Sequence, residues 1–468
     1  MAAVLHLVTG TAEVLASLRR SLADPEPMTA ESVITAPLPP GGSELARTRA
    51  MLRPELPVTE PDAAAIVATS GSTGHPRGVV LSRTALIASA EATAVRLGGH
   101  GSWVLALPAH YVAGLMVLVR AIVGGRPVHP VDGRLTELPG LVEYELNATE
   151  GPYYTAVVPT QLSRALTDPV LTRALAGFDA VLLGGAAADP SLLERASAAG
   201  IRVVTTYGMS ETCGGCVYDG LPLDGVSVST GDQGRISIGG PTLFSGYRLD
   251  PAATAETLID GRLRTRDRGR FTGNRLTVLG RLDDIVISGG MNVDLAAVER
   301  ALRGWVAETS RDDDPSLPTA GAGPTAGAGP TDPVTAEVAV VGVPHPEWGT
   351  EVVAVVETGK NLPLVHGPPP DPGATNATRG RFSLSELRDS LSAELPHYAL
   401  PRRLLIRALP RTSSGKIDRR RLVADLCRPT VGDRTAGGRP AGDRTAGGRT
   451  VSDQSVSEPV VSEPAESR

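Results

Sequence analysis

One ten-residue stretch, 69–78, decides most of what this sequence can be expected to form. It reads Thr-Ser-Gly-Ser-Thr-Gly-His-Pro-Arg-Gly and directly follows the apolar segment 63–68, which predicts a strand. Glycines among hydroxyl side chains expose backbone N–H groups and hydroxyl donors, which suits phosphate oxygens. No Gly-Lys-Ser/Thr closes the run, so it is not a Walker A loop. Alone, it is equally compatible with a flexible turn, and the rest of the chain has to decide.

The bulk properties indicate a multidomain enzyme-sized chain without a nucleic-acid or membrane partner. A length of 468 residues allows two or three domains. The net charge of −6 and an aromatic content of 3% provide neither a basic surface nor stacking platforms for bases. The N-terminus has no basic segment before its apolar residues, and the most apolar window, 111–123, carries Arg120 and is too short to span a bilayer. We therefore expect a buried helix there and a cytoplasmic protein.

The three cysteines, Cys213, Cys216 and Cys427, are too few for a disulfide framework. Cys213 and Cys216 have CxxC spacing, but no second CxxC or nearby pair of histidines completes a zinc site. We interpret them as small residues beside a binding loop in a reducing cytosol.

A βαβ unit is predicted in the middle of the chain. Strands at 178–183 and 201–206 flank a helix that Asp189 caps and that runs to Ala199. The loops 184–188 and 207–212 should then lie at one edge of a parallel sheet, where ligands of open α/β sheets bind. The glycine-rich stretch at 69–78 also follows a strand and is expected to face the same crevice, while Ser82 is expected to cap a helix over 84–97.

The composition changes after residue 280. A polar turn, a short strand and Gly289-Gly290 precede a helix that Asp294 caps and that is expected to reach about Gly304. Strands are predicted at 337–342 and 351–356, and a helix at 384–395 with Ser383 or Ser385 at its start. The Pro/Gly-rich segments 311–336 and 361–380 predict mobile insertions, and 429–468 a disordered repetitive tail.

Lysine is used very sparingly in this chain. Lys and Arg together number 45, yet only Lys360 and Lys416 are lysines. Lys360 stands beside a Pro-rich loop, whereas Lys416 follows a Ser-Ser-Gly turn in Pro-Arg-Thr-Ser-Ser-Gly-Lys-Ile-Asp-Arg-Arg. There its compact ammonium would be a movable point charge, which the planar fork of arginine would not reproduce.

Taken together, these stretches resemble the ANL superfamily of adenylate-forming enzymes, which comprises acyl-CoA synthetases, adenylation domains and luciferases. The resemblance spans about residues 60–425 and rests on motifs in the family's order. They are the phosphate loop at 69–78, Tyr-Gly-Met-Ser-Glu-Thr at 207–212, Thr-Arg-Asp at 265–267, the hinge and Ser-Gly-Gly segment at 280–292, and Lys416.

The resemblance implies an α/β fold. A large N-terminal domain (1–282) with mixed or parallel sheets and helices would bind ATP and the acid. A small mobile α+β domain (283–428) would carry Lys416. Only 68 residues precede the phosphate loop, so the first subdomain is shortened.

The family's roles carry over to matching residues. Tyr207 would stack on adenine in a pocket lined by Gly184, Gly185 and Ala186, while Asp267 and Arg281 would hold the ribose. Glu211 would bind Mg²⁺, a cation that prefers oxygen ligands. The full set expected to bind ATP is Thr69, Ser70, Gly71, Ser72, Thr73, Gly74, Arg77, Gly78, Gly184, Gly185, Ala186, Tyr207, Gly208, Thr212, Asp267 and Arg281.

The implied reaction has two halves. A carboxylate attacks the α-phosphorus of ATP to give an acyl-adenylate and pyrophosphate, with Lys416 and Mg²⁺ balancing phosphoryl charge. The small domain then turns about Asp283, which withdraws Lys416 and brings Gly289 and Gly290 beside the pantetheine of CoA. The thiol of CoA attacks the adenylate, and AMP leaves.

The acid is indicated by a subgroup resemblance. Leu-Pro-Ala-His-Tyr-Val-Ala-Gly-Leu at 107–115 and Val-Pro-Thr-Gln at 158–161 look like segments of the compact o-succinylbenzoate–CoA ligases of menaquinone synthesis. His110 would border the acyl pocket, although a histidine before an apolar helix is also a common capping or packing residue. Arg120 is a candidate partner for the acid's second carboxylate.

Three departures from the family pattern concern nucleotide geometry. Arg77 replaces the usual lysine of the phosphate loop, Arg266 replaces the glycine before Asp267, and Met291 fills a usually polar position. Arg266 would either crowd the ribose or point outward.

Alternatives remain open from the sequence. Within the fold, the acid could be another aryl or fatty acid, or the acceptor a carrier-protein thiol. In a different class, the chain would be a non-catalytic nucleotide-binding scaffold. A homo-oligomer is compatible with the sequence, which does not specify the assembly.

Overall fold

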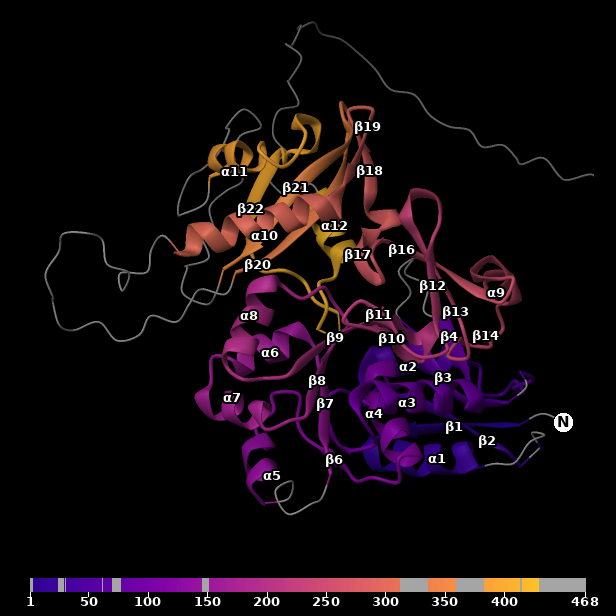
Figure 1. The fold of residues 1–468 in the computed structure, drawn as a ribbon. Helices are drawn as coiled ribbons and strands as arrows, with labels where there is room; N and C mark the ends of the chain where they lie inside the picture. Colours follow the sequence, from indigo (N-terminus) through magenta and orange to yellow (C-terminus); the bar gives the residue numbers. More distant parts are fainter. Residues whose placement is uncertain are drawn as a thin grey trace, which may run out of the picture. The chain divides into compact units, whose positions relative to one another are not determined.

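The structure is a computed structural model of the full chain. It describes residues 3–23, 29, 31–60, 62–69, 77–144, 151–311, 336–358, 383–412 and 415–428. Outside this set lie Ser70, Gly71, Ser72, Thr73 and Gly74 of the glycine-rich stretch, nearly all of the 311–336 insertion, the 361–380 loop and the 429–468 tail. Residues on both sides of Asp283 belong to one compact unit (Figure 1). Within the described residues, no helix combines the length and the apolar character needed to cross a membrane.

The first sheet contains five strands in the order β1-β2-β3-β4-β14. β1, β2 and β3 are parallel, and β3 pairs antiparallel with β4, so the two strands flank the glycine-rich stretch. The strand predicted at 63–68 is confirmed, and its first five residues are buried. The bounds are β1 Val4–Thr9, β2 Val33–Leu38, β3 Ala63–Thr69, β4 Arg77–Ser82 and β14 Gly246–Tyr247, with helices α1 Thr11–Ala23 and α2 Gly42–Leu52.

The second sheet contains seven strands in the order β11-β10-β9-β8-β7-β5-β6. β8 and β9 are parallel, and α8 lies between them in sequence, so the predicted βαβ unit is confirmed. The side chain of Asp189 accepts from the N–H of Ser191 and caps α8 as expected. The bounds are β5 Ser102–Leu105, β6 Val128–Pro130, β7 Tyr153–Val157, β8 Ala180–Leu183, β9 Val203–Met209, β10 Gly214–Tyr218, β11 Leu221–Pro222, α5 Leu138–Tyr144, α6 Pro159–Ala165, α7 Pro169–Ala176 and α8 Pro190–Ala198.

Two helices contribute to the main core together with residues of both sheets. α3 (Arg83–Leu97) is capped by Ser82, whose hydroxyl accepts from the N–H of Ala85, as predicted. α4 (Val112–Val123) is buried from Gly114 to Ala121, which confirms the buried helix expected in the most apolar window. Their apolar side chains share one cluster with β3, β4, β5 and β10. Burial of this apolar surface supplies the main stabilising contribution here.

A third sheet is antiparallel and links the two larger sheets to the C-terminal region. Its order is β12-β13-β16-β15, and β17 pairs with β16. The long strand β16 carries Thr265, Arg266 and Asp267, and β17 ends on Arg281. The bounds are β12 Ser227–Thr230, β13 Arg235–Gly239, α9 Pro251–Thr257, β15 Leu258–Ile259, β16 Arg262–Thr272 and β17 Arg275–Arg281.

The fourth sheet forms the smaller α+β region, in the order β19-β18-β21-β20 with β22 parallel to β21. Alternate residues of β20 face two clusters: Val338 and Val340 pack with α10, and Ala339 and Val341 pack with Leu422 of α12. The two helices therefore cover opposite faces of the sheet. The bounds are β18 Ile285–Ser288, β19 Met291–Asp294, α10 Leu295–Arg311, β20 Glu337–His345, β21 Gly349–Glu357, α11 Leu384–Leu391, β22 Arg403–Ile406 and α12 Arg419–Cys427.

Two helix ends differ from the expectation. Asp294 caps α10 as predicted, since its Oδ1 accepts from the N–H groups of Ala296 and Ala297. The helix continues past Gly304 to Arg311, however, because Trp305 and Val306 are buried in the core of this region and outweigh the low helix propensity of one glycine. α11 ends at Leu391 rather than 395, and its cap is Ser383, not Ser385.

Candidate active site

Two glycine-containing segments lie together where β8 and β9 leave their parallel pairing, as the sequence predicts. A β-carbon on Gly184 would lie 2.5 Å from the Thr206 hydroxyl, so the loop after β8 passes too close for a side chain. Gly185 has φ +84°, a conformation that favours glycine. Gly184 is partly exposed, and Gly185 and Ala186 are exposed. The loop therefore offers open backbone at this edge.

Tyr207 and Gly208 lie on β9 itself, not in the loop that was expected to follow residue 206. The strand continues to Met209 because Tyr207, Gly208 and Met209 pair with the antiparallel neighbour β10. A β-carbon on Gly208 would be 2.0 Å from the carbonyl oxygen of Gly214, which leaves no room for any other residue. The first three residues of the motif, 207–209, are therefore strand rather than loop, and they extend past the end of β8.

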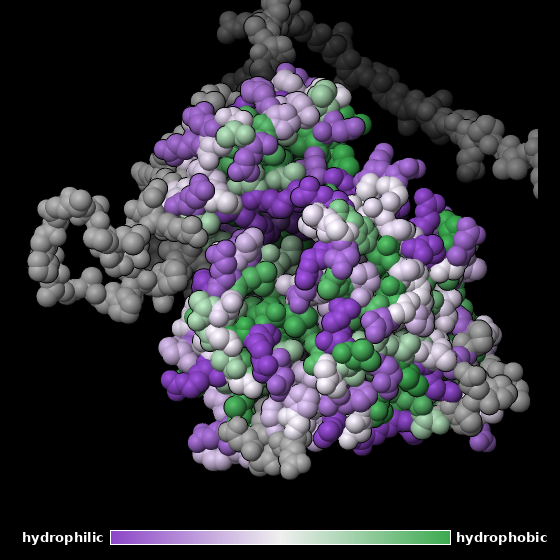
Figure 2. Space-filling model, viewed as in Figure 1, coloured by the Kyte–Doolittle hydropathy of each residue, from purple (hydrophilic) through white to green (hydrophobic). Residues whose placement is uncertain are grey.

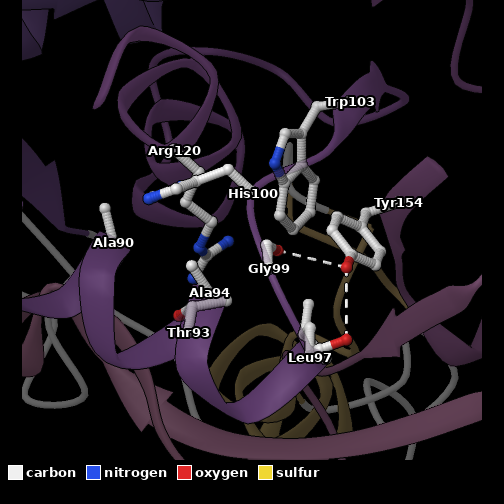
Figure 3. Close-up of a pocket in the computed structure, with 9 residues that line it drawn as sticks. All are labelled: Ala90, Thr93, Ala94, Leu97, Gly99, His100, Trp103, Arg120 and Tyr154. Atoms are coloured by element: carbon white, nitrogen blue, oxygen red, sulfur yellow. Dashed lines mark hydrogen bonds between the residues drawn. The ribbon is translucent and has the colours of Figure 1, made fainter. Parts of the chain in front are cut away.

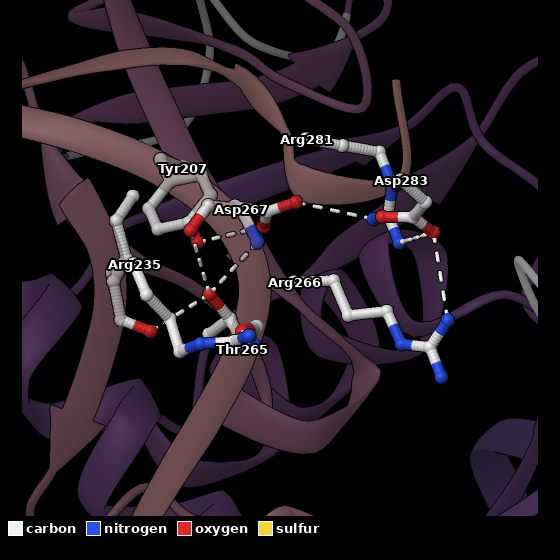
Figure 4. A network of polar contacts seen from close by, with 8 residues as sticks. Tyr207, Arg235, Thr265, Arg266, Asp267, Arg281 and Asp283 are labelled. Atoms are coloured by element: carbon white, nitrogen blue, oxygen red, sulfur yellow. Dashed lines mark hydrogen bonds and ion pairs between the residues drawn. The ribbon is translucent and has the colours of Figure 1, made fainter. Parts of the chain in front are cut away.

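Asp267 is the centre of a polar network (Figure 4). Its Oδ2 accepts from the hydroxyl of Tyr207 at 2.8 Å, and its Oδ1 lies 3.1 Å from Nη1 of Arg281. The N–H of Asp267 donates to Oγ1 of Thr265, a buried residue whose hydroxyl in turn donates to the carbonyl of Ile236. The carboxylate is thus fixed from two sides, with only 13% of the side chain exposed. A carboxylate has enough lone pairs to accept further hydroxyl donors in this setting.

Tyr207 remains a neutral donor in this network. Burial raises the pKa of its phenol well above the usual value, and the negative charge of Asp267 and the hydrogen bond to it act in the same direction. The ring is partly exposed, with its hydroxyl anchored, so one part of its surface remains available for contact. Asp267 and Tyr207 therefore combine an aromatic ring and a carboxylate within hydrogen-bond distance.

Glu211 lies on the 3₁₀ turn Ser210–Thr212 that follows β9. Its Oε1 accepts from the hydroxyl of Tyr247 at 2.8 Å. Burial and the charge of Glu211 raise the pKa of Tyr247, which therefore stays protonated and donates. The hydroxyl of Thr212 is bonded within its own turn, to the carbonyls of Met209 and Gly214. Thr212 thus shapes the turn and orients Glu211.

The two ends of the glycine-rich stretch reach the same neighbourhood. Thr69 and Arg77 are paired at the base of the β3–β4 hairpin. The guanidinium of Arg77 lies 4.9 Å from the centroid of the Tyr247 ring, on the residue that bonds Glu211. The hairpin belongs to the first sheet, whereas β8 and β9 belong to the second, and residues 70–76, which were expected to face the same crevice, lie outside the described residues. The base of the hairpin is connected to Glu211 by Tyr247, whose ring lies next to Arg77 and whose hydroxyl donates to Glu211.

Gly78 lies in a closely packed position at the base of the hairpin. A β-carbon there would lie 3.1 Å from Ile66 and 3.3 Å from the β-carbon of Arg248, while the carbonyl of Gly78 accepts from the N–H of Arg248. The glycine thus serves the hairpin base rather than an exposed loop.

Lys416 lies beside the loop after β8, although it is far away in the sequence. Its Cε would be 3.9 Å from a β-carbon on Gly185. The residue as a whole is exposed, yet desolvation by the surrounding protein, with the positive charge of Arg281 as a second cause, lowers its pKa. The side chain of Lys416 therefore lies next to the backbone of Gly185.

The segment expected to be a hinge is a charged junction. Asp283 accepts from Nη2 of Arg281 at 3.0 Å, and Nη1 of Arg266 lies 3.7 Å from the same oxygen of Asp283. Arg266 is exposed and points toward Asp283, away from the Tyr207–Asp267 contact (Figure 4). The replacement of the family's glycine by Arg266 thus does not crowd Asp267.

Gly289 and Gly290 form the turn between β18 and β19. Both have positive φ, +56° and +79°, which explains the double glycine. The N–H of Gly289 donates to the carbonyl of Trp348. Met291 is exposed at the start of β19. This turn is separate from the Tyr207–Asp267 contact in the described arrangement.

His110 lies just before α4, whereas Arg120 lies within the helix. His110 precedes the helix, close to the carboxyl end of β5, and its pKa is lowered by burial, with Glu44 opposing. Arg120 is near the other end of α4, 5% exposed, in a small cavity with Trp103, His100 and Tyr154 (Figure 3). Its Nη2 donates to the Tyr218 hydroxyl at 3.3 Å.

Arg120 has unused hydrogen-bonding capacity. Its Nε has no hydrogen-bond partner, and in the described part of the chain no carboxylate forms an ion pair with it. The guanidinium lies 5.2 Å from the centroid of the Trp103 ring. A buried cation without a carboxylate partner is costly and favours an anionic ligand.

Two of the three cysteines are packed in the core, and Cys427 is exposed at the end of α12. Cys213 and Cys216 are both fully buried, and burial raises the pKa of their thiols, that of Cys216 to about 12. Both are therefore protonated near neutral pH and poor nucleophiles.

Sequence reasoning missed Tyr247 as a neighbour of Glu211 and the orientation of Arg266 toward Asp283. Tyr247 follows Gly246 in the short strand β14, which joins the first sheet beside β4. No local pattern relates it to Glu211, so only the pairing of β14 with β4 would have indicated the contact.

Two family models match most of the large N-terminal region and most of the smaller α+β region. The AMP-binding enzyme family matches residues 2–248, and the AMP-binding enzyme C-terminal domain matches residues 331–416. The second match ends on Lys416 and spans β20 and β21 of the small sheet.

The relatives are ligases. A probable 2-succinylbenzoate–CoA ligase of Mycobacterium tuberculosis is 40% identical over 370 residues, covering 77% of this chain and 84% of that protein. A 2-succinylbenzoate–CoA ligase of Listeria monocytogenes is 27% identical over 380 residues, covering 77% and 69%. The solved o-succinylbenzoate CoA synthetase of Bacillus subtilis with its acyl-adenylate intermediate shares the fold, with a TM-score of 0.63 at 22% identity over 90% of this chain and 94% of that one.

The large region of mixed sheets, the smaller α+β region and the family matches agree with the expected fold. The chain belongs to the AMP-binding enzymes, the adenylate-forming family that its motifs resemble.

Proposed function

We propose that this protein is an AMP-forming acid–thiol ligase that activates a carboxylic acid with ATP and transfers the acyl group to CoA. The observation that carries the proposal is the proximity of Lys416 to Gly185, on the edge where Tyr207, Asp267 and Arg281 form one network. This edge combines an aromatic ring, a fixed carboxylate and two cations. These groups match adenine, the ribose hydroxyls and a phosphate chain, respectively.

We propose 2-succinylbenzoate as the acid. The support is the 40% identical relative from Mycobacterium tuberculosis, whose name gives this activity. The alignment covers 84% of that protein. The reaction would convert 2-succinylbenzoate, ATP and CoA to 2-succinylbenzoyl-CoA, AMP and diphosphate. A homo-oligomer is compatible with this activity but is not required by it.

In the adenylation step, Asp267 would accept hydrogen bonds from the ribose hydroxyls, and Arg281 would keep its carboxylate oriented. Tyr207 would place its ring against the adenine beside Gly184, Gly185 and Ala186. Lys416 would donate to phosphoryl oxygens that gain charge as the acid's carboxylate attacks the α-phosphorus. Such donors accelerate a reaction by matching the charge of the transition state.

Glu211 would hold Mg²⁺ together with phosphate oxygens of ATP. The fit is chemical: Oε1 of Glu211 is oriented by Tyr247, and a single carboxylate plus phosphate oxygens is a usual Mg²⁺ arrangement. Within the described ranges no cluster of three or more His, Cys, Asp or Glu side chains forms an all-protein metal site. Bound Mg²⁺ would neutralise phosphate charge, and Thr69 and Arg77 would border the phosphate end, whereas Thr212 and Gly78 are buried and would support it from behind.

For the thioester step we propose a division at 282/283, with the region 283–428 turning about Asp283. Ion pairs of Asp283 with Arg281 and Arg266 lie at this junction. Turning would remove Lys416 from the phosphate and bring the Gly289–Gly290 turn toward the thiol. His110 would border the acyl group.

Arg120 is our candidate for the second carboxylate of the acid. His110 follows the end of β5, and the guanidinium of Arg120 lies beside Trp103, near the start of the same strand. The buried, carboxylate-free setting of Arg120 supports the assignment.

The test is a panel of acids supplied with ATP and CoA, with thioester products identified by mass. We expect turnover of 2-succinylbenzoate well above that of benzoate and of short and medium fatty acids. Strong turnover of another acid with none of 2-succinylbenzoate would refute the substrate and retain the chemistry. Absence of AMP release with every acid would refute the ligase and favour a non-catalytic nucleotide-binding protein. Replacing CoA by a carrier-protein thiol distinguishes the acceptor.

A further inference from the structure

The segment that carries Lys416 is closed into a loop whose two ends lie side by side. Arg411 and Ile417 form an isolated antiparallel bridge. The N–H of Thr412 donates to the carbonyl of Lys416 at 2.8 Å, and the N–H of Asp418 donates to the carbonyl of Pro410 at 2.7 Å. The residues that hold these two ends in place therefore fix the position of Lys416.

Each end is held by an arginine paired with glutamate. At the first end, Arg411 contacts Glu337 and Glu357, the paired residues at the ends of β20 and β21. At the second end, Arg419 begins α12 and donates to Oε2 of Glu299 at 2.7 Å. Figure 2, in the same view as Figure 1, shows hydrophilic residues gathered near α12 and β17.

Glu299 is the most enclosed member of these pairs. It is 7% exposed, on α10, and its Oε1 lies 2.6 Å from Nη2 of Arg303. Its Oε2 also accepts the N–H of Val340 on β20, an edge strand of the small sheet. Burial alone would raise its pKa, but Arg419 and Arg303 outweigh it, so the pKa lies below the usual value.

Glu299 therefore joins three elements. α10 and α12 lie on opposite faces of the small sheet. Glu299, on α10, accepts from the N–H of Val340 on the edge strand β20 and from the guanidinium of Arg419 on α12. Arg419 is three residues after Lys416. The side chain of Arg419 is 44% exposed, and its hydrogen bond to Oε2 of Glu299 anchors it to α10.

We propose that Glu299 is a positioning residue for Lys416, which acts by fixing Arg419 and with it the end of the lysine loop. The proposal rests on the proposed function of Lys416 in adenylation. In an adenylation site, a misplacement of about 1 Å costs about 100-fold in rate, so an anchor three residues away affects the step even though it never contacts substrate.

The experiment compares the two half-reactions in full-length variants: ATP–pyrophosphate exchange for adenylation, and thioester formation from supplied acyl-adenylate and CoA. Glu299→Gln keeps the size of the side chain and removes the charge that holds Arg419. Arg419→Gln breaks the same pair at its more exposed partner and serves as the second variant if Glu299→Gln folds poorly. Arg303→Gln is the matched control, because Arg303 binds the other oxygen of Glu299 and is on the same helix, away from the lysine loop.

We expect Glu299→Gln and Arg419→Gln to lower exchange by about 10- to 100-fold, with thioester formation within about twofold of wild type. Arg303→Gln should stay close to wild type in both. A double variant should be decisive: in a Lys416→Ala background, Glu299→Gln should have no further effect on exchange, because its influence passes through Lys416.

Equal loss of both half-reactions, unchanged exchange in both variants of the pair, or a further loss in the Lys416→Ala background would overturn the proposal. If Lys416→Ala itself leaves exchange unchanged, the proposed function of Lys416 fails instead. The two failures are thus distinguishable.

Discussion

The hydroxyl of Tyr207 donates to Oδ2 of Asp267 at 2.8 Å, and this contact joins the second sheet to the third. Tyr207 is on β9 and Asp267 on β16, so the ring and the carboxylate are supported by separate frameworks. A nucleoside placed against both would be held at its base and at its sugar.

Asp267→Asn is expected to weaken ATP binding. The change removes the charge that accepts from Arg281 and from the ribose hydroxyls. Hydrogen bonds to charged groups are worth about 1.5–3 kcal/mol, so KM for ATP should rise by about 10- to 100-fold. Tyr207→Phe should have a smaller effect, since it removes one neutral donor. Steady-state kinetics at saturating acid and CoA provide the measurement, and an unchanged KM for ATP in Asp267→Asn would contradict the ribose assignment.

Lys416→Ala is expected to separate the two half-reactions. Loss of one electrostatic contact in a transition state costs about 10²–10³-fold in rate, so pyrophosphate exchange should fall by that factor. Thioester formation from supplied acyl-adenylate should survive, because the lysine is withdrawn in that step. Lys360→Ala is the control, as the only other lysine in the chain. Parallel loss of both half-reactions would argue against alternation.

The pH profile should show the lowered pKa of Lys416. Its ammonium is the active form, and since desolvation and Arg281 lower its pKa from 10.5, it loses its proton at a lower pH than a free lysine. The kcat/KM for adenylation should therefore fall as the pH rises through this lowered pKa. Lys416→Arg stays charged and should move the alkaline fall to higher pH, even if its rate is lower. An identical alkaline limb in both proteins would assign the titration to another group.

Tyr247→Phe is expected to weaken the dependence on Mg²⁺ through Glu211. The variant loses only the hydroxyl that donates to Glu211 at 2.8 Å. Changes in groups that orient a metal ligand commonly cost about 10- to 100-fold in metal affinity, so the Mg²⁺ concentration for half-maximal exchange should rise within that range. Calorimetric titration of the ATP-bound protein with Mg²⁺ gives a second reading. Tyr144→Phe, at a 75% exposed site, should leave both readings unchanged.

Arg120→Gln is expected to act on the acid alone. If Arg120 pairs with the second carboxylate of 2-succinylbenzoate, KM for this acid should rise by about 10- to 100-fold, as for other hydrogen bonds to charged groups. KM for ATP should not change, and acids with one carboxylate should be affected little. A matching rise for a monocarboxylic acid would show that Arg120 supports the fold around Trp103 rather than the substrate.

Much of this architecture follows from local sequence. Ser82, Asp189 and Asp294 were identifiable as helix caps because Ser and Asp side chains bond N–H groups two or three residues further on, whereas Ser383 and Ser385 were both candidates until the structure decided for Ser383. The βαβ unit and the β20–β21 pair were predictable for the same reason, since apolar runs and turn residues determine them at short range. Tyr207 as part of a strand, and the last turn of α10, were not, because pairing with β10 and burial of Trp305 decided them.

The candidate site divides in the same way. Its motifs, their order and the two scarce lysines were determined by the sequence alone, and they were sufficient to indicate an adenylate-forming enzyme. Only the tertiary structure decided that Tyr247 orients Glu211, that Arg266 turns to Asp283, and that Lys416 reaches Gly185. These contacts join residues on different sheets, and their geometry depends on how those sheets pack, which no short-range pattern of side chains encodes.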